Sequence, residues 1–431
     1  MLKRVLIANR GEIALRIQRA CAALGIETVA AYSRVDESLL HLRYADDAVC
    51  VGSTSYLDVN NMVMAALSRG CDAVHPGYGF LSENAAFAAA VEDAGLAFIG
   101  PKAEHIELMG DKVNARAVAA ELGLAVTPGS SLVEDADAGA QAEALGFPVM
   151  LKAAAGGGGR GMRIVETNAD LAGALARARE EARTFFGSDG IYLERFYPAP
   201  RHVEVQVLGD GAGAGIHYLT RDCSVQRRHQ KLIEEAPAPA IEGDKLTGLG
   251  EQCAEAVARL GYRGAGTFEF LYADDTFYFM EMNTRLQVEH PVTEMVTGVD
   301  LVAAQLRIAG GDTVLPAGEE RGHAIECRIN AEDDAFRPSP GRVTELILPG
   351  GAGIRVDTHL YPGYVVPHHY DSLVAKVIAH GGDRAEALAR MLRALRELRI
   401  GGIETNRKRH IEMLSDPAFQ AGGVDTGFLR N

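Results

Sequence analysis

Residues 281–291 have the sequence EMNTRLQVEHP, in which polar and apolar side chains alternate. Side chains of a strand point to opposite faces in turn, so an extended segment would carry every second residue on one face. That face would hold Glu281, Asn283, Arg285, Gln287 and Glu289. The apolar run FYFM at 277–280 precedes it and predicts a buried strand. We therefore expect these polar side chains to leave a protein core at the end of a strand.

A further acid precedes this segment in the sequence TFEFL at 267–271, where Glu269 lies between two aromatic residues. The residues ADD at 273–275 predict a turn, so the two segments read as a hairpin. Two carboxylates and the amide of Asn283 on paired strands suit Mg²⁺, which prefers oxygen ligands. An acidic sheet edge is the alternative. The arginine, glutamine and acid that follow suit an anion beside a metal and a base.

Length and composition indicate a soluble, ordinary globular enzyme of two or three domains. Hydrophobic residues make up 47% and charged residues 23% of the 431 positions. No apolar run approaches the roughly 18 residues of a membrane span. The net charge of −15 disfavours polyanion binding. We expect neither a nucleic acid nor a membrane as partner.

Six cysteines show no metal-ligand spacing and are expected to be reduced thiols. The first residues, MLKR, run directly into the strand-like VLIA at 5–8. That leaves no room for a targeting peptide, and the expected location is cytoplasmic.

The first 110 residues predict an open, mostly parallel sheet with helices on both faces. Residues 5–9 form the first strand, residues 10–12 a turn, a helix ends at Gly25, and residues 27–33 form the next strand. No G-x-G-x-x-G motif follows the first strand. The loop HPGYGFLSEN at 75–84 ends a strand, where ligands bind in such sheets, although a plain Pro-Gly turn gives the same pattern.

A glycine-rich segment lies between two predicted strands. FPVMLK at 147–152 leads into AAAGGGGRGM at 153–162, and a strand continues to residue 165. The glycines therefore belong to a hairpin and not to a P-loop, because no G-K-[ST] follows. Backbone amides of such a loop could close over phosphates beside Lys152, or the loop could be a flexible linker.

Three further segments show either a strand-like alternation of polar and apolar residues or a cluster of basic residues. IYLERF at 191–196 predicts a strand and hinge whose backbone could contact a purine, and RHVEVQV at 201–207 predicts a strand with His202, Glu204 and Gln206 on one face. That face is either a site or a half-exposed sheet surface. The basic run RDCSVQRRHQK at 221–231 lacks interleaved aromatics. It suits small anions, or is a solvated face.

Beyond Asp300 the pattern predicts a helix to about residue 309. AIECRIN at 324–330 predicts a strand that projects Glu326, Arg328 and Asn330 together. The sequence DRAE at 383–386 is a capping box that opens a helix to about Leu398.

Taken together, these motifs resemble biotin carboxylase, the ATP-grasp subunit or domain of biotin-dependent acyl-CoA carboxylases such as acetyl-CoA carboxylase. The resemblance extends from residue 5 to the end of the chain and is carried by IANRGEIA (7–14), HPGYGFLSEN (75–84), GDK (110–112), GGGGRGM (156–162), RHVEVQV (201–207), RDCSVQRRHQK (221–231), GAGTFEF (264–270), EMNTRLQVEHPVTE (281–294) and ECRINAED (326–333).

The resemblance implies an α/β (α+β overall) architecture with an ATP-grasp fold. Residues 1–110 would form a Rossmann-like domain, residues 111–310 the ATP-grasp region with a mobile lid at about 128–197, and residues 311–431 a mixed α+β C-terminal domain.

The resemblance also implies a role for each site residue. ATP would be bound by Lys112, Lys152, Gly156, Gly157, Gly158, Gly159, Glu194, Arg195, Phe196, Tyr197, His202, Gln226, His229, Glu269, Leu271 and Glu281. Mg²⁺ or Mn²⁺ would be bound by Glu269, Glu281 and Asn283. Bicarbonate and biotin would contact Lys231, Arg285, Gln287, Val288, Arg328, Tyr78 and Glu83. The catalytic residues would be Arg285, Lys231, Glu289 as the base and Arg328 as the group that stabilises the biotin enolate.

Family members often have a glycine at the position of Ala155, and lysine and leucine at the positions of Arg195 and Tyr197.

The implied reaction is the first half-reaction of a biotin-dependent carboxylase: bicarbonate attacks ATP, carboxyphosphate forms, and biotin on a carrier protein is carboxylated.

The implied partners are a biotin carboxyl carrier protein or domain, a carboxyltransferase subunit and a second copy of the chain, in a cytoplasmic enzyme of the kind that serves fatty acid biosynthesis. No Met-Lys-Met attachment site is present, so the biotin is expected on another chain or a further C-terminal portion. A bicarbonate-activating ligase of carbamoyl-phosphate type and a non-catalytic nucleotide-binding scaffold are the alternatives.

Overall fold

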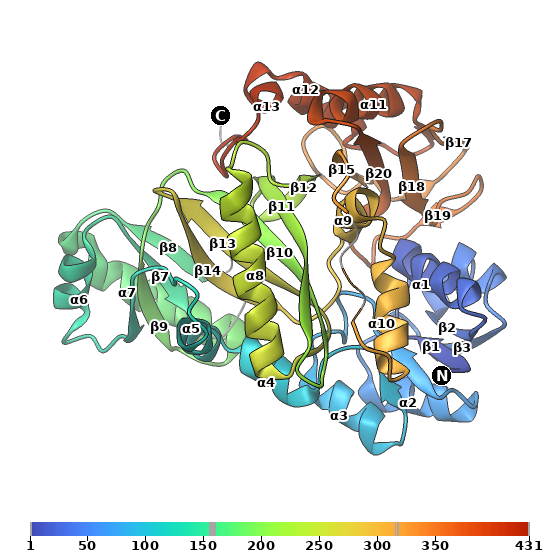
Figure 1. Ribbon diagram of the computed structural model, residues 1–431, viewed down its shortest axis with the longest axis horizontal. Helices are drawn as coiled ribbons and strands as arrows, with labels where there is room; N and C mark the ends of the chain where they lie inside the picture. Colours follow the sequence, from blue (N-terminus) through green and yellow to red (C-terminus); the bar gives the residue numbers. More distant parts are fainter. Residues whose placement is uncertain (1, 155–160, 315, 317–318, 430–431) are drawn as a thin grey trace.

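The N-terminal residues form an open sheet of five parallel strands, which confirms the predicted sheet (Figure 1). The computed structural model describes residues 2–154, 161–314, 316 and 319–429. The strand order is β3–β2–β1–β4–β5. The bounds are β1 (Arg4–Ile7), β2 (Glu27–Ser33), β3 (Asp47–Gly52), β4 (Ala73–His75) and β5 (Ala97–Phe98).

Helices cover both faces of this sheet because its central strands are apolar on both sides. Val5 and Ile7 of β1 pack against α1 (Gly11–Ala23) and α10 (Leu301–Ala309), whereas Leu6 packs with α2 (Val59–Ser68) and α3 (Ala85–Asp93). The turn predicted at residues 10–12 was wrong, since α1 already begins at Gly11. The apolar stripe of this helix begins only at Ile13, so the sequence pattern did not reveal its first two residues.

An eight-stranded sheet forms the centre of the molecule. Its order is β14–β13–β10–β11–β12–β15–β20–β18, and every neighbouring pair is antiparallel. The bounds are β10 (Arg201–Asp210), β11 (Gly215–Arg227), β12 (Gln230–Ala236), β13 (Arg263–Ala273), β14 (Thr276–Asn283), β15 (His323–Asn330), β18 (Ile354–Thr358) and β20 (Leu373–Gly381).

This sheet joins distant parts of the chain. Strand β12 pairs with β15, so the strands of residues 201–283 and those of residues 323–381 belong to one hydrogen-bonded surface. The predicted hairpin is confirmed: β13 and β14 pair with Glu269 opposite Glu281, and the turn between them holds Asp274 and Asp275. Side chains from both ends of the chain can therefore meet on one face.

Residues 129–195 form a separate four-stranded sheet of order β6–β9–β7–β8, at the left of Figure 1. Its bounds are β6 (Gly129–Leu132), β7 (Val149–Ala153), β8 (Met162–Val165) and β9 (Ile191–Arg195), with α6 (Ala138–Leu145) and α7 (Asn168–Phe186). It has an apolar core of its own. Strands β7 and β8 pair as the predicted hairpin. Ala155, Gly156, Gly157, Gly158 and Gly159 lie outside the described residues.

The remaining elements complete the layers around these sheets. They are α4 (Ala103–Gly110), α5 (Lys112–Glu121), α8 (Gly243–Leu260), α9 (His290–Thr297), α11 (Arg384–Glu397), α12 (Arg407–Ser415), α13 (Pro417–Ala421), the strands β16 (Gly341–Arg342), β17 (Glu345–Ile347), β19 (Val365–Val366) and β21 (Arg399–Gly401), and the 3₁₀ turns η1 (Arg34–Asp36) and η2 (Leu40–Arg43). The capping residue predicted for α11 is confirmed, because Asp383 accepts from the backbone N–H of Glu386.

Two expectations about strands need correction. The extended register predicted from Glu281 to Glu289 stops at Asn283, where β14 ends, and α9 begins at His290. The segment RHVEVQV is not half-exposed either: residues 201–207 are buried on both faces. The period-two pattern is the same for a strand whose polar face is covered by other polar groups, so the sequence could not separate the two cases.

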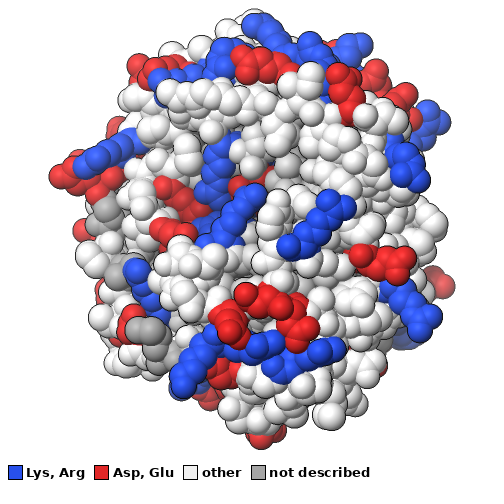
Figure 2. Space-filling view, turned by 90° about the vertical axis from the view of Figure 1, so that its right-hand side faces the viewer, with Lys and Arg blue, Asp and Glu red and all other residues white. Residues whose placement is uncertain are grey.

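On the face seen in Figure 2, the Lys and Arg side chains are interrupted by Asp and Glu side chains and do not merge into one patch. Among the described residues, no helix has the length and apolar character that a membrane span requires.

We predict that Phe268→Ala lowers the free energy of unfolding by about 3–5 kcal/mol, the usual cost of deleting a buried ring. Phe268 is fully buried and its ring packs edge-on against Phe279. Leu57→Ala is the control, because Leu57 is 58% exposed. Urea unfolding followed by far-ultraviolet circular dichroism measures both. Equal losses in the two variants would contradict the assignment of this core.

Candidate active site

One large cavity, of about 1470 Å³, lies among the N-terminal sheet, the β6–β9 unit and the eight-stranded sheet. Its lining includes these predicted residues: Tyr78, Glu83, Lys112, Lys152, Glu194, Arg195, Phe196, Tyr197, His202, Gln226, His229, Lys231, Glu269, Leu271, Glu281, Asn283, Arg285, Gln287, Val288 and Arg328. Among the described residues predicted for the site, Glu289 alone is not in the lining; its side chain is fully buried behind the wall. The structure thus brings the predicted residues together around one space.

The ammonium group of Lys231 is the central charge of the site. Its Nζ donates to Glu204 Oε2 at 2.6 Å, to Glu269 Oε1 at 2.8 Å and to Glu289 Oε1 at 2.6 Å. An ammonium has three protons to donate. Burial opposes the charged form, but the surrounding acidic groups raise the pKa of Lys231 well above its ordinary value. One side chain from β12 therefore ties together β10, β13 and the segment before α9.

Glu289 lies between two cations. Its Oε1 accepts from Lys231, and its Oε2 accepts from Arg328 Nη2 at 3.0 Å. Burial favours the neutral acid, but Lys231, Arg328 and Arg221 together hold the pKa of Glu289 well below its ordinary value. The resting state is therefore a carboxylate, and it gains affinity for a proton only when a cation contact weakens.

Arg328 reaches the site from β15 and is shared by two acids. Besides Glu289 it contacts Glu234 of the neighbouring strand, with Nε 2.5 Å from Glu234 Oε1. Burial raises the pKa of Glu234 to about 7, although Arg328 opposes that shift. The guanidinium is thus oriented by one carboxylate of low pKa and one that titrates near neutrality.

A second guanidinium, that of Arg285, lies at the cavity wall. Its Nε donates to Glu83 Oε2 at 2.7 Å, and its Nη atoms donate to Gln287 Oε1 at 3.0 Å and Asn283 Oδ1 at 3.1 Å. Glu83 also accepts from the backbone N–H of Thr284 at 3.2 Å. The loop that follows β4 in the N-terminal sheet therefore borders the cavity and positions Arg285, while ligand binding by this loop stays a prediction.

Lys112, Lys152 and Tyr197 line the other end of the cavity. Lys112 Nζ lies 2.9 Å from Glu281 Oε2, and Lys152 forms an ion pair with Glu194. Tyr197 stacks on Tyr278 with ring centroids 5.1 Å apart. This end offers positive charge beside flat apolar surface, which suits the phosphates and the base of a nucleotide.

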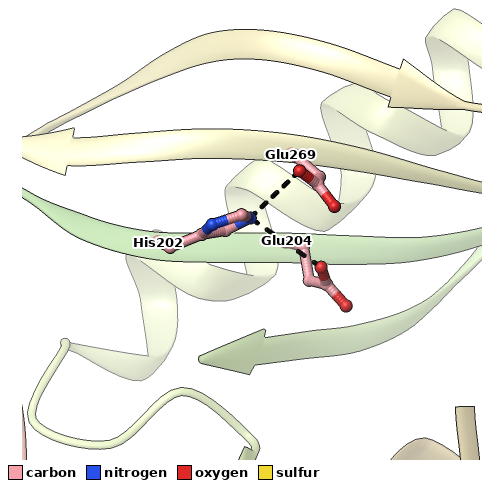
Figure 3. Close-up of side chains that lie close together, drawn as sticks. All are labelled: His202, Glu204 and Glu269. Atoms are coloured by element: carbon pink, nitrogen blue, oxygen red, sulfur yellow. Dashed lines mark ion pairs between the residues drawn. The ribbon is translucent and has the colours of Figure 1, made fainter. Parts of the chain in front are cut away.

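Three potential metal ligands converge where β10 and β13 pair. Figure 3 shows His202 and Glu204 on one strand and Glu269 on the next, pointing toward one another. The ring Nε2 of His202 lies 3.1 Å from Glu269 Oε2, and although burial opposes it, Glu269 raises the pKa of His202. The raised pKa favours the protonated ring, and Lys231 donates to both carboxylates, so these three side chains form an ion cluster in this structure. That Glu269, Glu281 and Asn283 bind a cation through their side-chain oxygens stays a prediction.

Sequence reasoning missed several groups that organise the site. Arg221 is fully buried and donates to Glu204, to Gln206 Oε1 at 2.8 Å and to Thr293 Oγ1 at 2.9 Å. Basic residues in such a run are usually exposed to solvent, whereas Arg221 is buried. Its position within a strand was the only sequence feature that could have indicated burial. Lys376, a lone lysine in the apolar segment LVAKVIA at 373–379, gave an even clearer signal.

Comparison with known proteins covers the whole chain. Residues 1–106 match the family model described as the N-terminal domain of biotin carboxylase, and residues 326–431 match its C-terminal domain. Residues 111–316 match the model described as the ATP binding domain of the carbamoyl-phosphate synthase L chain. Biotin carboxylase of Pseudomonas aeruginosa is 55% identical over 440 residues, covering 100% of this chain and 98% of the relative.

Solved structures agree with these matches. A biotin carboxylase from Campylobacter jejuni, in a beta-gamma-ATP complex, superposes with a TM-score of 0.97 at 46% identity and covers 100% of this chain and 99% of the other. The biotin carboxylase domain dimer of 2-oxoglutarate carboxylase from Hydrogenobacter thermophilus, with MgADP, ADP and bicarbonate, has a TM-score of 0.95 at 43% identity, covering 100% and 97%.

We predict that Glu234→Gln flattens the dependence of stability on pH. The pKa of Glu234 rises from 4.5 to about 7 on folding, so the native state binds more protons than the unfolded state and stability falls as pH rises through this window. Melting temperatures of wild type and variant between pH about 5 and about 8 would measure the effect.

Glu235→Gln is the control for this comparison. Burial raises the pKa of Glu235, but His323 and Arg384 outweigh it and lower the pKa below 4.5. Its stabilising contribution is therefore lost only at more acidic pH, and its variant keeps the wild-type slope in the window tested. Parallel profiles for wild type and Glu234→Gln would contradict the pKa assigned to Glu234.

Proposed function

The chain belongs to the biotin carboxylase family and catalyses the ATP-dependent carboxylation of biotin, and we propose that Lys231 and its three carboxylates are the centre of that reaction. The observation that carries the proposal is the position of Glu289 between Lys231 and Arg328. A buried carboxylate beside a cavity, held by two cations, suits a base that takes a proton from one substrate and lies next to the second.

ATP lies, in this proposal, along the wall shared with the β6–β9 unit. Its phosphates are bound by Lys112, Lys152, Gly156, Gly157, Gly158, Gly159 and His202, and its base lies along Glu194, Arg195, Phe196, Tyr197 and Leu271, with Gln226 and His229 at the edge. Support comes from the two lysines and from Tyr197, which line this end of the cavity, with Tyr278 stacked on the Tyr197 ring. The glycines form part of the proposal although they lie outside the described residues.

Glu269, Glu281 and Asn283 are proposed as the ligands of Mg²⁺ or Mn²⁺. Glu269 and Glu281 are opposite residues of β13 and β14, and Asn283 ends β14. Their carboxylate and amide oxygens are the hard donors that these ions prefer. The ion supplies charge neutralisation at the phosphate oxygens during transfer.

Bicarbonate activation follows from the cations that surround Glu289. Lys231, Arg285, Gln287 and the backbone amide of Val288 bind the anion, and Glu289 accepts its proton while a bicarbonate oxygen bonds to the γ-phosphorus and the bond to ADP breaks. The low pKa of Glu289 makes it a weak base at rest. Its base strength rises when Lys231 turns toward the incoming anion, so proton transfer is tied to bicarbonate binding.

The second half-reaction uses Arg328. Carboxyphosphate breaks its carbon–oxygen bond to give carbon dioxide and phosphate, phosphate takes the ureido N–H proton, and that nitrogen bonds to carbon dioxide. The guanidinium of Arg328 stabilises the negative oxygen of the biotin enolate. Tyr78 and Glu83 border this part of the cavity. Exclusion of water by the β6–β9 unit protects the intermediate from hydrolysis.

The chain is a subunit or domain of a biotin-dependent carboxylase and works with a biotin carrier and a carboxyltransferase. We further propose a homodimer, as in the H. thermophilus domain, a cytoplasmic location, and an acyl-CoA acceptor of fatty acid biosynthesis. The proposed domains are residues 1–110, 111–310 with a lid at about 128–197, and 311–431, which agrees with the separate core of the β6–β9 unit.

A carbamoyl-phosphate type of ligase shares the central matched segment. It would accept ammonia in place of biotin. ADP release stimulated by biotin and not by ammonia is the expected result, because the matches on either side of that segment are to biotin carboxylase.

We predict that Glu281→Gln abolishes ATP cleavage, because it removes one of two charges that face the cation. Affinity for Mg²⁺, measured by calorimetric titration of the metal into the enzyme with ADP, falls as well. Asp275→Asn is the matched control: Asp275 belongs to the turn of the same hairpin, is exposed, and is expected to leave both quantities unchanged. Metal-dependent cleavage at the wild-type rate in Glu281→Gln would refute the metal assignment.

We predict that Arg328→Ala and Glu289→Gln separate the two half-reactions. In Arg328→Ala the base keeps its contact with Lys231, so bicarbonate-dependent ATP cleavage remains while carboxybiotin formation falls about 10²- to 10³-fold, as for loss of an oxyanion donor. In Glu289→Gln the amide cannot accept a proton, so both activities fall together.

ADP and carboxybiotin are measured side by side in both variants. Residual cleavage without carboxybiotin in Glu289→Gln, and a joint loss in Arg328→Ala, would show that the two roles are assigned the wrong way round.

A further inference from the structure

In the turn that carries Val288 and Glu289, side chains of other residues donate hydrogen bonds to two backbone carbonyl oxygens. It connects β14 to α9, and no strand pairing orients it in the described structure. His290 Nδ1 donates to the carbonyl oxygen of Gln287 at 2.8 Å. Lys376 Nζ donates to the carbonyl oxygen of Val288 at 2.8 Å. Two consecutive peptide groups are thus held by side chains.

Peptide planarity converts these two bonds into orientation of the site. In a trans peptide the C=O and N–H groups point in opposite directions. Because the Gln287 carbonyl points to His290, the N–H of Val288 points the other way, and Val288 lines the cavity. Because the Val288 carbonyl points to Lys376, the plane of the next peptide is held too, and that peptide leads directly into Glu289.

Lys376 lies directly opposite Arg328 on the neighbouring strand of the eight-stranded sheet. It belongs to β20, between residues of the C-terminal apolar core, and its side chain is fully buried. Its only other described polar contact is Glu12 Oε1 of α1, at 3.1 Å, and Glu12 also accepts from the Tyr78 hydroxyl. One buried ammonium therefore connects the N-terminal sheet, the C-terminal strands and the turn before α9.

A buried lysine is a costly way to obtain stability. Desolvating the ion pair consumes most of its attraction, and a well-packed apolar residue of the same volume often serves as well. What an apolar side chain cannot do is donate a hydrogen bond to the Val288 carbonyl. That geometric difference separates a positioning role from a purely structural one.

We propose that Lys376 is a positioning residue that orients the Val288–Glu289 peptide for bicarbonate, and that through Glu12 it couples this turn to Tyr78. The inference rests on the proposed function, in which Val288 binds bicarbonate and Glu289 is the base. Lys376 does not touch substrate; it acts through the backbone of the turn.

The test is steady-state kinetics of Lys376→Met, which keeps the length and apolar stem of the side chain. Bicarbonate-dependent ATP cleavage is measured with bicarbonate and with ATP as the varied substrate. We expect KM for bicarbonate to rise about tenfold, the effect of losing a charged hydrogen-bond donor, while KM for ATP changes less than about twofold. Equal changes in both, or none in the bicarbonate KM, would overturn the proposal.

Two variants control for stability. Arg384→Met removes another partly buried cation of the C-terminal region, paired with the buried Glu235, and lies outside the cavity lining. It is expected to lower the melting temperature without raising the bicarbonate KM. The double variant Lys376→Met/Glu12→Gln also removes the charge of Glu12, which the single variant leaves buried without its ammonium partner. It should regain melting temperature but keep the high bicarbonate KM.

The double variant also decides the question if Lys376→Met alone does not fold. Recovery of the bicarbonate KM together with the melting temperature would make Lys376 only a balancing charge and overturn the proposal. Arg285→Ala tests the proposed bicarbonate site separately. A raised bicarbonate KM in Arg285→Ala with none in either Lys376 variant refutes only the positioning role, whereas no change in Arg285→Ala refutes the proposed site itself.

Discussion

The contact of Lys231 with Glu204, Glu269 and Glu289 is the interaction on which the rest of the site depends. Three carboxylates cannot share a buried volume unless a cation neutralises them, because each loses its hydration. The charge of Lys231 lowers the electrostatic cost of burying the three acids together. The three contacts also hold β10, β13 and the turn before α9 next to one another. Removing that charge would leave Glu204, Glu269 and Glu289 with only their second partners, Arg221, His202 and Arg328 respectively.

A second constraint is the continuity of the eight-stranded sheet. Because β12 pairs with β15, Arg328 and Glu234 lie on neighbouring strands, although they are 94 positions apart in the chain. Arg328, proposed to stabilise the enolate, also donates a hydrogen bond to Glu289, the proposed base. Such an arrangement keeps the two half-reactions close together, so a reactive intermediate travels little before it is used.

The electrostatic design combines opposite pKa shifts within a few ångströms. Cations outweigh burial at Glu289 and keep it ionised, whereas burial dominates at Glu234 and brings its pKa to about 7. Both acids contact the same guanidinium. A site that moves protons and forms anions needs such differences, because identical carboxylates could not take separate roles.

Sequence alone predicted many of the elements and named the residues that the structure brings together around one cavity. The alternation in residues 267–283 predicted the β13–β14 hairpin, the glycine-flanked strands predicted β7 and β8, and the combined motifs indicated the family. These signals are local, since period and turn chemistry depend on neighbouring residues. Tertiary structure alone decided that residues 284–289 leave the strand, that Arg221 is buried, and that Lys376 and Glu12 meet behind Val288. These outcomes depend on ion pairs and hydrogen bonds between residues that are far apart in the chain, such as Lys376 and Glu12. Such long-range pairs produce no periodic pattern in the sequence, so sequence analysis could not detect them.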